Sequence, residues 1–199
     1  MRRFVVVGRR AIASPDFSLA DIPGTSGRLD VLLRCVRAAL LVSHGLRRDV
    51  VVYLVLLGTP GAPKTVRIDG SAAKYLRPDE RHLATTVKKA LAAPIERSGF
   101  VEARNGIAVA DGGLEAAVDD VRGARSYVLD QRGEDVRSVA LAEDSVFFLG
   151  DHLGLDDDAR AKLDALAPVL VSVGPIAVQA DDAIAIVSNE VDRRGGQRD

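Results

Sequence analysis

Short apolar runs alternate with segments of helical periodicity along almost the whole chain. We expect the apolar runs to form strands over residues 3–8, 50–58, 64–70, 105–113, 126–130, 145–150, 170–174 and 183–189. The run VVVYLVLLG at 50–58 is apolar at nearly every position, which is typical of a strand buried on both faces of a parallel sheet.

Helical spacing predicts helices over residues 27–45, 77–93, 114–122 and 155–168. The second of these begins with Pro78, Asp79 and Glu80 and ends with two lysines, an order that suits the helix dipole. Segment 9–26 is rich in turn-forming residues, so we expect a long loop of the kind that often serves function. With no convincing linker, the alternation of strands and helices predicts one α/β domain over residues 1–199 around a mostly parallel sheet.

The charge distribution points to a polyanionic partner, although the formal net charge is only −1. Residues 1–100 hold 17 Lys and Arg against 8 Asp and Glu, a net of +9, while residues 101–199 hold 10 against 20, a net of −10. This split predicts one face that attracts an anionic polymer. The alternative is chance segregation that is compensated across a subunit interface.

Other features exclude several classes of protein. The single cysteine, Cys35, excludes an internal disulfide, and the three histidines lack metal-ligand spacing, so we expect no metal. The dinucleotide and P-loop glycine motifs are absent. The chain has neither a signal-peptide pattern nor an apolar stretch of spanning length, so we expect a cytoplasmic protein. Aromatic residues make up 4% of the chain, with no tryptophan, and offer no obvious stacking platform for unpaired bases.

The stretch SVFFLGDHLGL at 145–155 interrupts a predicted strand at Gly150, and Gly174 ends another strand in the same way. In open α/β sheets ligands bind beyond the carboxyl ends of strands, where glycine permits close approach. Each glycine alone is more simply a turn residue. We expect Asp151 and His152 to fix the loop rather than to do chemistry.

Two polar motifs lie at predicted helix starts. In PGTSGRLD, Arg28 and Asp30 precede Arg34, and the arrangement is either an exposed salt-bridge ladder or an edge that faces phosphates and bases. In LRPDERH, helix-start chemistry explains Asp79 but leaves the flanking arginines unexplained.

Together these motifs resemble a known family. Gly-Arg-x-Asp, Pro-Asp-Glu-Arg and Leu-Gly-Asp-His-x-Gly, with PKTVRIDG and NEVDR in the same order, are similar to the tRNA pseudouridine N1-methyltransferases found mainly in archaea. Those enzymes are S-adenosylmethionine-dependent RNA methyltransferases of the SPOUT superfamily. The resemblance extends from Phe4 to about Arg193. It implies a SPOUT fold with a C-terminal deep trefoil knot over about residues 125–194, and a homodimer with active sites near the subunit interface.

The resemblance also implies a reaction, a cofactor and a set of site residues. The reaction is methylation of ring N1 of a pseudouridine in the T arm of tRNA, at position 54. S-adenosylmethionine would lie in the knot, held by four segments of the chain, the last of which leads into the final predicted strand. The residues that would contact it are Leu129, Gly150, Val171, Ser172, Val173, Gly174, Pro175, Ile176 and Ala183. Similar proteins often carry a cysteine where this chain has Ala183, which alters one contact with the cofactor.

We hypothesise that Asp30 acts as the base or orients the substrate, that Arg28 holds a uracil carbonyl or phosphate, and that Asp79 and Arg81 shape the pocket wall. The predicted tRNA contacts are Arg34, Arg37, Arg47, Arg48, Lys88 and Lys89. Two alternatives stay open. One is methylation of a ribosomal RNA pseudouridine. The other is a knotted RNA-binding protein without turnover, which Ala183 and the acidic pair at 181 and 182 favour.

Overall fold

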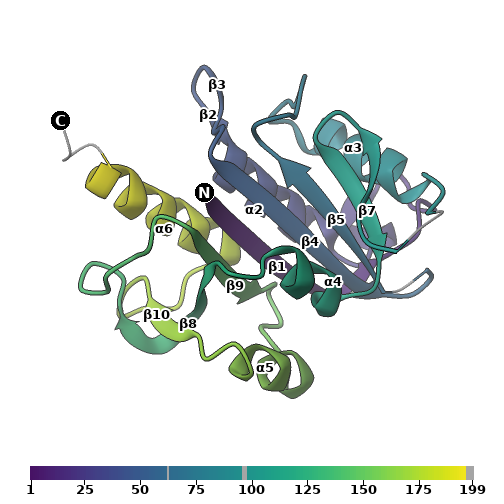
Figure 1. The fold of residues 1–199 in the computed structure, drawn as a ribbon. Coiled ribbons are helices and arrows are strands. Elements are labelled where there is room, and N and C mark those ends of the chain that lie inside the picture. The colour runs from purple at the N-terminus through teal and green to yellow at the C-terminus, as the bar shows by residue number, and fades with distance from the viewer. Residues whose placement is uncertain (62, 96–97, 196–199) are drawn as a thin grey trace.

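The computed structural model describes residues 1–61, 63–95 and 98–195. Within these residues eight strands form one sheet in the order β10-β8-β9-β1-β4-β5-β7-β6 (Figure 1). The strands are β1 (Arg2–Ile12), β4 (Val50–Gly58), β5 (Lys64–Asp69), β6 (Val101–Arg104), β7 (Ile107–Asp111), β8 (Arg125–Asp135), β9 (Ser145–Gly150) and β10 (Val169–Ser172). A separate hairpin pairs β2 (Leu41–Val42) with β3 (Gly45–Leu46). From β10 to β4 the neighbouring strands are parallel, and β5, β7 and β6 continue the sheet in antiparallel fashion.

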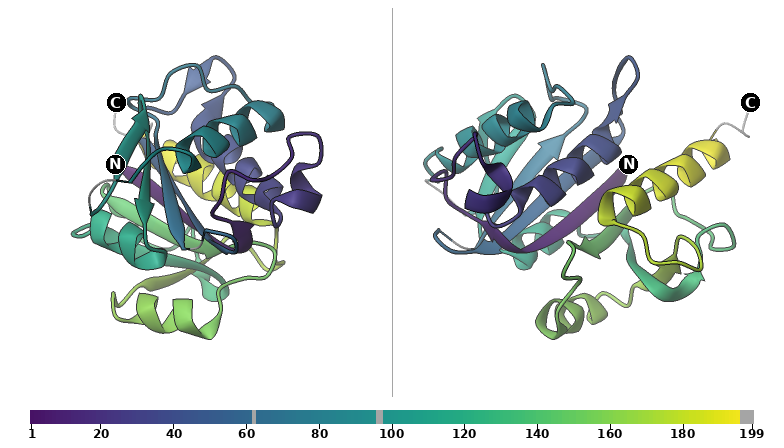
Figure 2. Two further views of the ribbon diagram at one scale, coloured as in Figure 1. Left: turned by 90° about the vertical axis from the view of Figure 1, so that its right-hand side faces the viewer. Right: turned by 180° about the vertical axis from the view of Figure 1, so that it is seen from behind.

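Helices cover both faces of the sheet (Figure 2). They are α1 (Ile22–Thr25), α2 (Leu29–Leu40), α3 (Glu80–Leu91), α4 (Leu114–Asp120), α5 (Asp157–Asp164) and α6 (Ala180–Gly195). Residues of α2, α3 and α6 belong to one apolar cluster, and residues of α4 and α5 belong to a second one. In β1, Phe4 and Val6 enter the first cluster while Val5 and Val7 enter the second, because successive side chains of a strand point to opposite faces. The expected α/β class with helices around a largely parallel sheet is therefore confirmed.

An aromatic column ties the parallel strands together on the face that α2 and α6 cover. Phe147 of β9 stacks on Phe4 of β1 at 5.5 Å and on Tyr127 of β8 at 5.0 Å between ring centroids. The strand register places these three residues side by side. The Tyr127 hydroxyl donates to the carbonyl of Ala140 at 3.1 Å and accepts from the amide of Ala142 at 2.9 Å, so the column also anchors the loop before β9.

The predicted strand at 183–189 is wrong, because this segment lies within helix α6. The letters AIAIVS alternate in a strand-like way, but the buried positions are Ala183, Ile184, Val187 and Ser188, which recur at helical spacing. Asp181 and Asp182 lie in the first turn of α6, where the helix dipole favours acidic side chains. The segment before α6 therefore leads into a helix rather than into a last strand.

Four further features differ from expectation. β1 continues to Ile12, and a short helix, α1, occupies part of the predicted loop at 9–26. Helix α2 ends at Leu40, because residues 41–46 form the β2–β3 hairpin. Strand β6 was not expected.

Among the described residues, none of the helices is long and apolar enough to cross a membrane.

We predict that Phe147→Ala lowers the free energy of unfolding by about 3–5 kcal/mol, since it removes the middle ring of a fully buried column. Urea unfolding followed by circular dichroism measures the change. Val42→Ala, in the exposed hairpin, serves as the control and should stay within about 0.5 kcal/mol of the wild type. A loss below about 1 kcal/mol for Phe147→Ala would contradict this account of the core.

Candidate active site

A pocket of about 910 Å³ lies beyond the carboxyl end of β9, between α2 and the chain that leads into α6. It is lined by Arg28, Val31, Arg34, Leu129, Asp130, Gln131, Leu149, Gly150, Asp151, His152, Gly154, Leu155, Arg160, Ala177, Val178, Gln179, Ala180 and Ala183. A smaller cavity of about 180 Å³ adjoins it along residues 171–178 and shares part of this lining. The position agrees with the rule that ligands bind at the carboxyl ends of parallel strands.

Gly150 is needed because the loop after β9 folds back on the strand. A Cβ at this position would lie 2.3 Å from the backbone carbon of Gly154, closer than any side chain tolerates. The buried Asp151 then fixes the loop, since its carboxylate accepts hydrogen bonds from the amides of Arg9 at 3.1 Å and Leu153 at 2.9 Å. The expectation that Asp151 fixes the loop is confirmed.

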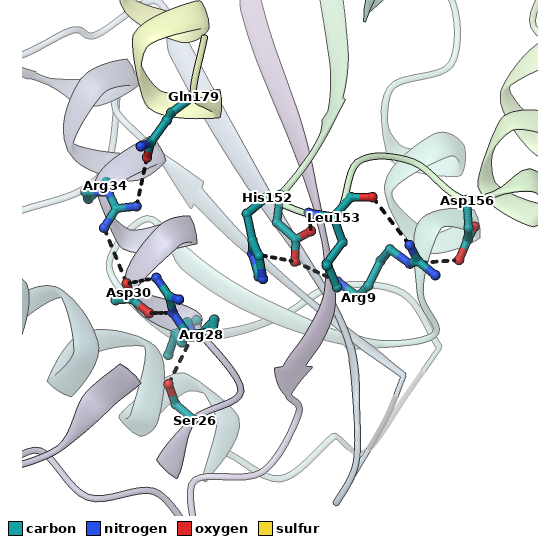
Figure 3. Close-up of polar contacts among 11 residues, drawn as sticks. Arg9, Ser26, Arg28, Asp30, Arg34, His152, Leu153, Asp156 and Gln179 are labelled. Carbon is teal, nitrogen blue, oxygen red and sulfur yellow. Dashed lines mark hydrogen bonds and ion pairs between the residues drawn. The ribbon is translucent and has the colours of Figure 1, made fainter. Parts of the chain in front are cut away.

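His152 lines this side of the pocket, and Arg9 holds the same loop by polar contacts (Figure 3). The Nδ1 atom of His152 lies 3.9 Å from the Asp151 carboxylate. The Arg9 guanidinium forms an ion pair with Asp156 at 3.4 Å and reaches the carbonyl of Leu153 at 3.4 Å. The loop is therefore tied to the end of β1 and to the start of α5.

The opposite side of the pocket is formed by the start of α2. Gly27 and Arg28 both have positive φ, of 63° and 69°. Gly27 is required, because a Cβ there would lie 1.9 Å from the carbonyl oxygen of Arg10. Arg28 has a Cβ, and a non-glycine residue in the left-handed region is strained. The strained turn directs the Arg28 side chain back to Asp30 and leaves it lining the pocket.

Asp30 is the centre of an ion cluster (Figure 3). It is 3% exposed and accepts from Arg28 Nε at 2.9 Å, Arg28 Nη2 at 3.1 Å and Arg34 Nη1 at 3.3 Å. Burial opposes ionisation of this carboxyl, but the hydrogen bonds and charges of the two arginines outweigh it and leave its pKa below the ordinary value. Asp30 is therefore an ionised, fully engaged carboxylate at neutral pH.

Arg34 connects this cluster to the C-terminal part of the chain. Its Nη2 donates to Gln179 at 3.3 Å and its Nε lies 3.6 Å from Asp181. Because Gln179 and Asp181 flank the start of α6, the side chain bridges the two segments that border the pocket. We expected Arg34 as an RNA contact, and the structure places it in the pocket wall instead of on an open surface.

An excursion of β8 forms the floor of the pocket. Leu170 pairs with Val128 and Val171 pairs with Glu134, so residues 129–133 leave the sheet between two neighbouring rungs of the ladder. Gly133 permits this, since a Cβ there would lie 2.4 Å from the amide of Val171.

Within this excursion Asp130 is held by two arginines. It accepts from Arg132 Nε at 3.0 Å and Nη2 at 2.9 Å, and from Arg160 Nη1 at 3.0 Å. These hydrogen bonds, led by those of Arg132, lower the pKa of Asp130 well below its ordinary value even though burial acts in the opposite direction. Arg160 thereby links α5 to the pocket floor.

The predicted cofactor residues meet around this pocket and the small cavity beside it. Leu129, Gly150 and Ala183 line the pocket, and the cavity is lined by Val171, Ser172, Val173, Gly174 and Ile176, together with Leu129 and Ala183. Pro175 lies on a different depression, with Ile186 of α6. Ser172 Oγ donates to the carbonyl of Gly174 at 2.8 Å, which orders this turn.

The predicted catalytic residues Asp79 and Arg81 lie outside the pocket. Asp79 caps α3, where its carboxylate accepts from the amide of His82 at 2.8 Å, so the helix-start explanation of this motif is confirmed. Asp79 also borders a separate hollow beside α2. Arg81 is exposed in the first turn of α3.

The remaining predicted RNA contacts divide into engaged and exposed side chains. Arg47 is held by Asp192 at 2.6 Å, and Lys88 donates to the carbonyl of Phe17 at 2.6 Å. Arg37 and Lys89 are exposed. Arg48 is exposed as well, although its Nη1 donates to the backbone of residues 70–73. The charge excess of the first half is thus only partly available to a partner.

Sequence reasoning missed several polar residues of the pocket. Asp130, Gln131, Arg160 and Gln179 line it, yet they come from three segments that are far apart in the chain. No motif in the sequence marks these residues as one set, because nothing local connects the three segments. The described residues contain no group of three or more metal-ligating side chains.

The lining suits a compact, zwitterionic ligand such as S-adenosylmethionine. The volume lies in the range of small-molecule sites. Apolar walls at Leu129, Leu149 and Val178 can cover an adenosine, while Asp130 and Gln131 offer polar groups. A Cβ at Gly174 would meet nothing within 4 Å, so the small cavity is open beside this glycine.

We predict that stability depends on pH through Asp130. Since its folded pKa is lowered, its pairing stabilises the protein above the unfolded value of about 3.9 and is lost as pH falls through the lower folded pKa. Asp130→Asn should therefore lose about 1–3 kcal/mol at pH 7, and much less near pH 2. Urea unfolding at several pH values measures this. Asp164→Asn, at an exposed position of α5, is the control, and equal losses for Asp130→Asn at both pH values would refute the prediction.

Comparison with known proteins agrees with these observations along the whole chain. Residues 1–195 match a family model described as "SAM-dependent RNA methyltransferase". A tRNA (pseudouridine(54)-N(1))-methyltransferase of Methanocella arvoryzae is 44% identical over 98% of this chain and 100% of its own length. One of Halobacterium salinarum, with the same name, is 45% identical over 98% of each chain.

The fold has a counterpart among solved structures. The crystal structure of Archaeoglobus fulgidus Nep1 bound to S-adenosylhomocysteine superimposes with a TM-score of 0.67 over 98% of each chain, at 18% identity. This likeness shows that the two chains share a fold, and it agrees with the α/β architecture expected from the sequence. By the match of the family model and the full-length identity to these relatives, the chain belongs to the S-adenosylmethionine-dependent RNA methyltransferases and, within them, to the family of tRNA (pseudouridine(54)-N(1))-methyltransferases.

Proposed function

We propose that this protein transfers a methyl group from S-adenosylmethionine to N1 of pseudouridine 54 in the T arm of tRNA. The observation that carries the proposal is that one pocket is bordered by three expected cofactor residues, Leu129, Gly150 and Ala183, and by Arg28 and Arg34, the two arginines that Asp30 holds. Five more of the expected cofactor residues line the cavity that adjoins it. The names of the full-length relatives support the substrate.

The pocket floor and the turn before α6 are the parts that would hold the cofactor. S-adenosylmethionine, when bound, supplies a methyl group that a ring nitrogen can attack in line. The chain's own task is to bind and orient: the 129–131 excursion and the 171–178 segment provide backbone and apolar contacts, and Ala183 leaves room at the start of α6.

Arg28 is the residue best placed to hold the substrate base. Two of its nitrogens are engaged by Asp30, while Nη1 has no partner among the described residues. A guanidinium fixed in this way can donate to a uracil carbonyl or to a neighbouring phosphate. Because Asp30 prevents the side chain from rotating away, little conformational entropy is lost when the substrate binds.

Of the two roles hypothesised for Asp30, its contacts favour orientation over proton abstraction. Both carboxylate oxygens accept hydrogen bonds from arginines, and its lowered pKa makes it a weak base. Asp30 is thus a positioning residue that acts through Arg28. Asp79 belongs to the proposal as part of the hollow beside α2, and Arg81 as an exposed residue at the start of α3; both would contact the RNA outside the pocket.

The proposal includes one domain over residues 1–199, a knot over about residues 125–194, and action in the cytoplasm. The larger apolar cluster supports a single domain, since it contains residues from Phe4 to Val187. The excursion of β8 and the packing of α6 on α2 are compatible with a knotted segment of this length. The cytoplasmic location follows from the tRNA substrate.

A homodimer is a further part of the proposal. Leu170, Ile176, Val178 and Ile186 are exposed apolar side chains of β10, α6 and the segment between them. β10 is also the last strand of the described sheet, and its free edge favours a covering partner. A second copy on this face would place the pocket near the subunit interface.

The test is methyl transfer from labelled S-adenosylmethionine to a tRNA transcript that carries pseudouridine at position 54, with uridine at 54 as the control. Transfer to the pseudouridine transcript alone supports the proposal. Transfer only to a pseudouridine-containing ribosomal RNA fragment would support the alternative substrate. Absence of S-adenosylmethionine binding in calorimetry would support an RNA-binding protein without turnover.

In the same assay we predict that Asp30→Asn lowers kcat about 100-fold, because Arg28 loses its orientation. Asp30→Glu should recover part of this rate. S-adenosylmethionine affinity serves as the control for an intact fold and should stay unchanged. For a positioning residue the loss is equal from pH 6 to pH 9, whereas a loss that high pH repairs would assign Asp30 the role of proton acceptor.

For the homodimer we predict that Ile176→Asp converts the protein to a monomer, since a charge at a 74% exposed apolar position would be buried in the interface. Light scattering after size-exclusion chromatography measures the mass. Val42→Asp, at an exposed apolar position of the β2–β3 hairpin, is the matched control and should leave the dimer intact. A dimer that survives Ile176→Asp would exclude this face.

A further inference from the structure

A second and larger hollow, of about 1230 Å³, lies on the other side of Arg34 from the pocket. Its walls are the second half of α2 with the β2–β3 hairpin, residues 73–78, and the first turn of α6. We call it the α2 groove. Arg34 lines both the pocket and the α2 groove, and its ion pairs with Asp30 and Asp181 hold it between them. A chain that leaves the pocket past Arg34 therefore enters this groove.

Tyr75 presents an aromatic ring in the α2 groove. It is 83% exposed, while the other two tyrosines, Tyr53 and Tyr127, are 2% and 1% exposed. Its φ of 58° is in the left-handed region, which costs a non-glycine residue about 1 kcal/mol or more. The folded chain thus holds a large apolar ring in water, on a strained backbone, at the edge of a hollow.

Hydrogen bonds and close packing fix the segment that carries Tyr75. Arg48 Nη1 donates to the carbonyl of Gly70 at 2.9 Å and to that of Ala73 at 3.2 Å. The amide of Ala73 donates to the carbonyl of Asp69 at 2.8 Å, and Gly106 packs so closely that a Cβ there would lie 2.4 Å from that amide. The backbone that carries the ring is therefore ordered before a ligand binds, which reduces the conformational entropy lost on binding.

The charges around the ring suit a phosphate chain. Arg37 and Lys74 line the groove and have no side-chain partner among the described residues. Asp181 also lines it but is paired with Arg34, so Asp182 is the acid of the wall that has no partner within the described part of the chain. Two free cations beside an exposed aromatic ring are the arrangement with which proteins bind unpaired nucleotides.

We propose that the α2 groove binds an unstacked nucleotide of the RNA, adjacent in the chain to the one in the pocket. Its base stacks on Tyr75, and its phosphates contact Arg37 and Lys74. The inference rests on the proposed function for the identity of the RNA, and it adds a binding site outside the methyl-transfer pocket.

RNA affinity tests the inference without any methyl transfer. We measure the Kd of a fluorescent oligouridine and of the T-arm transcript by anisotropy. Tyr75→Ala should weaken both about five- to 100-fold, whereas Tyr75→Phe, which keeps the stacking face, should stay within about threefold of the wild type. Since the chain has no tryptophan and the other tyrosines are buried, RNA should also quench tyrosine fluorescence in the wild type and not in Tyr75→Phe or Tyr75→Ala.

Salt dependence tests the phosphate contacts. Lys74→Ala should reduce the slope of log Kd against log salt by about 0.7 for one lost phosphate contact. Arg122→Ala is the matched control, because it removes an equal charge from the turn after α4, on the opposite face of the sheet, and should leave the slope unchanged.

The outcomes separate the two proposals. If the wild type methylates the pseudouridine transcript but Tyr75→Ala binds RNA as tightly as the wild type, the groove inference is wrong and the proposed function stands. If no RNA is methylated but Tyr75→Ala still loses oligouridine affinity, the proposed function fails and the groove inference stands. A change of oligomeric state in Tyr75→Ala, with RNA affinity preserved, would assign the groove to a protein contact and overturn the inference.

Discussion

Much of the site depends on one buried carboxylate. Asp30 is shielded from water and is neutralised by Arg28 on one side and Arg34 on the other. A buried carboxylate without these partners would be strongly destabilising, so folding fixes both guanidinium groups. Arg28 is thereby held at the pocket, and Arg34 is held where it also reaches Gln179 and Asp181 at the start of α6. One ion cluster thus sets how the first half of the chain faces the segment that would bind the cofactor.

The elements at the centre of the sheet could be predicted because their sequence period and their burial agree. The apolar run at 50–58 and the β-branched run after Arg3 became β4 and β1, the strands with apolar layers on both faces. The expectation that Asp151 fixes the loop after β9 was correct, since the contacts involved are local: Asp151 accepts from the amide of Leu153, and Gly150 lies against Gly154. Local chemistry of this kind is visible in a sequence.

What could not be predicted depends on contacts between distant segments. The run at 183–189 alternates like a strand, and only its packing on α2 decides that it is a helix. Asp130 and Arg160 meet because residues 129–133 leave the sheet, which depends on the approach of Gly133 to Val171. No local pattern marks such a juxtaposition. The knowledge that these segments form one site came from resemblance rather than from composition or spacing.

The structure also changes what the charge count means for RNA binding. The first half has a net charge of +9, but many of its arginines are bound within the protein, Arg2 and Arg47 by Asp192 and two more by Asp30. A side chain held in a short ion pair contributes less to phosphate binding than a free one, because its partner cancels much of its field. Among the described residues, the cations without a side-chain partner include Arg37, Lys74 and Lys89, which lie on or beside α2 and α3. These three lie near the α2 groove or on α3, so the RNA contacts that we propose draw on part of the basic half of the sequence rather than on all of it.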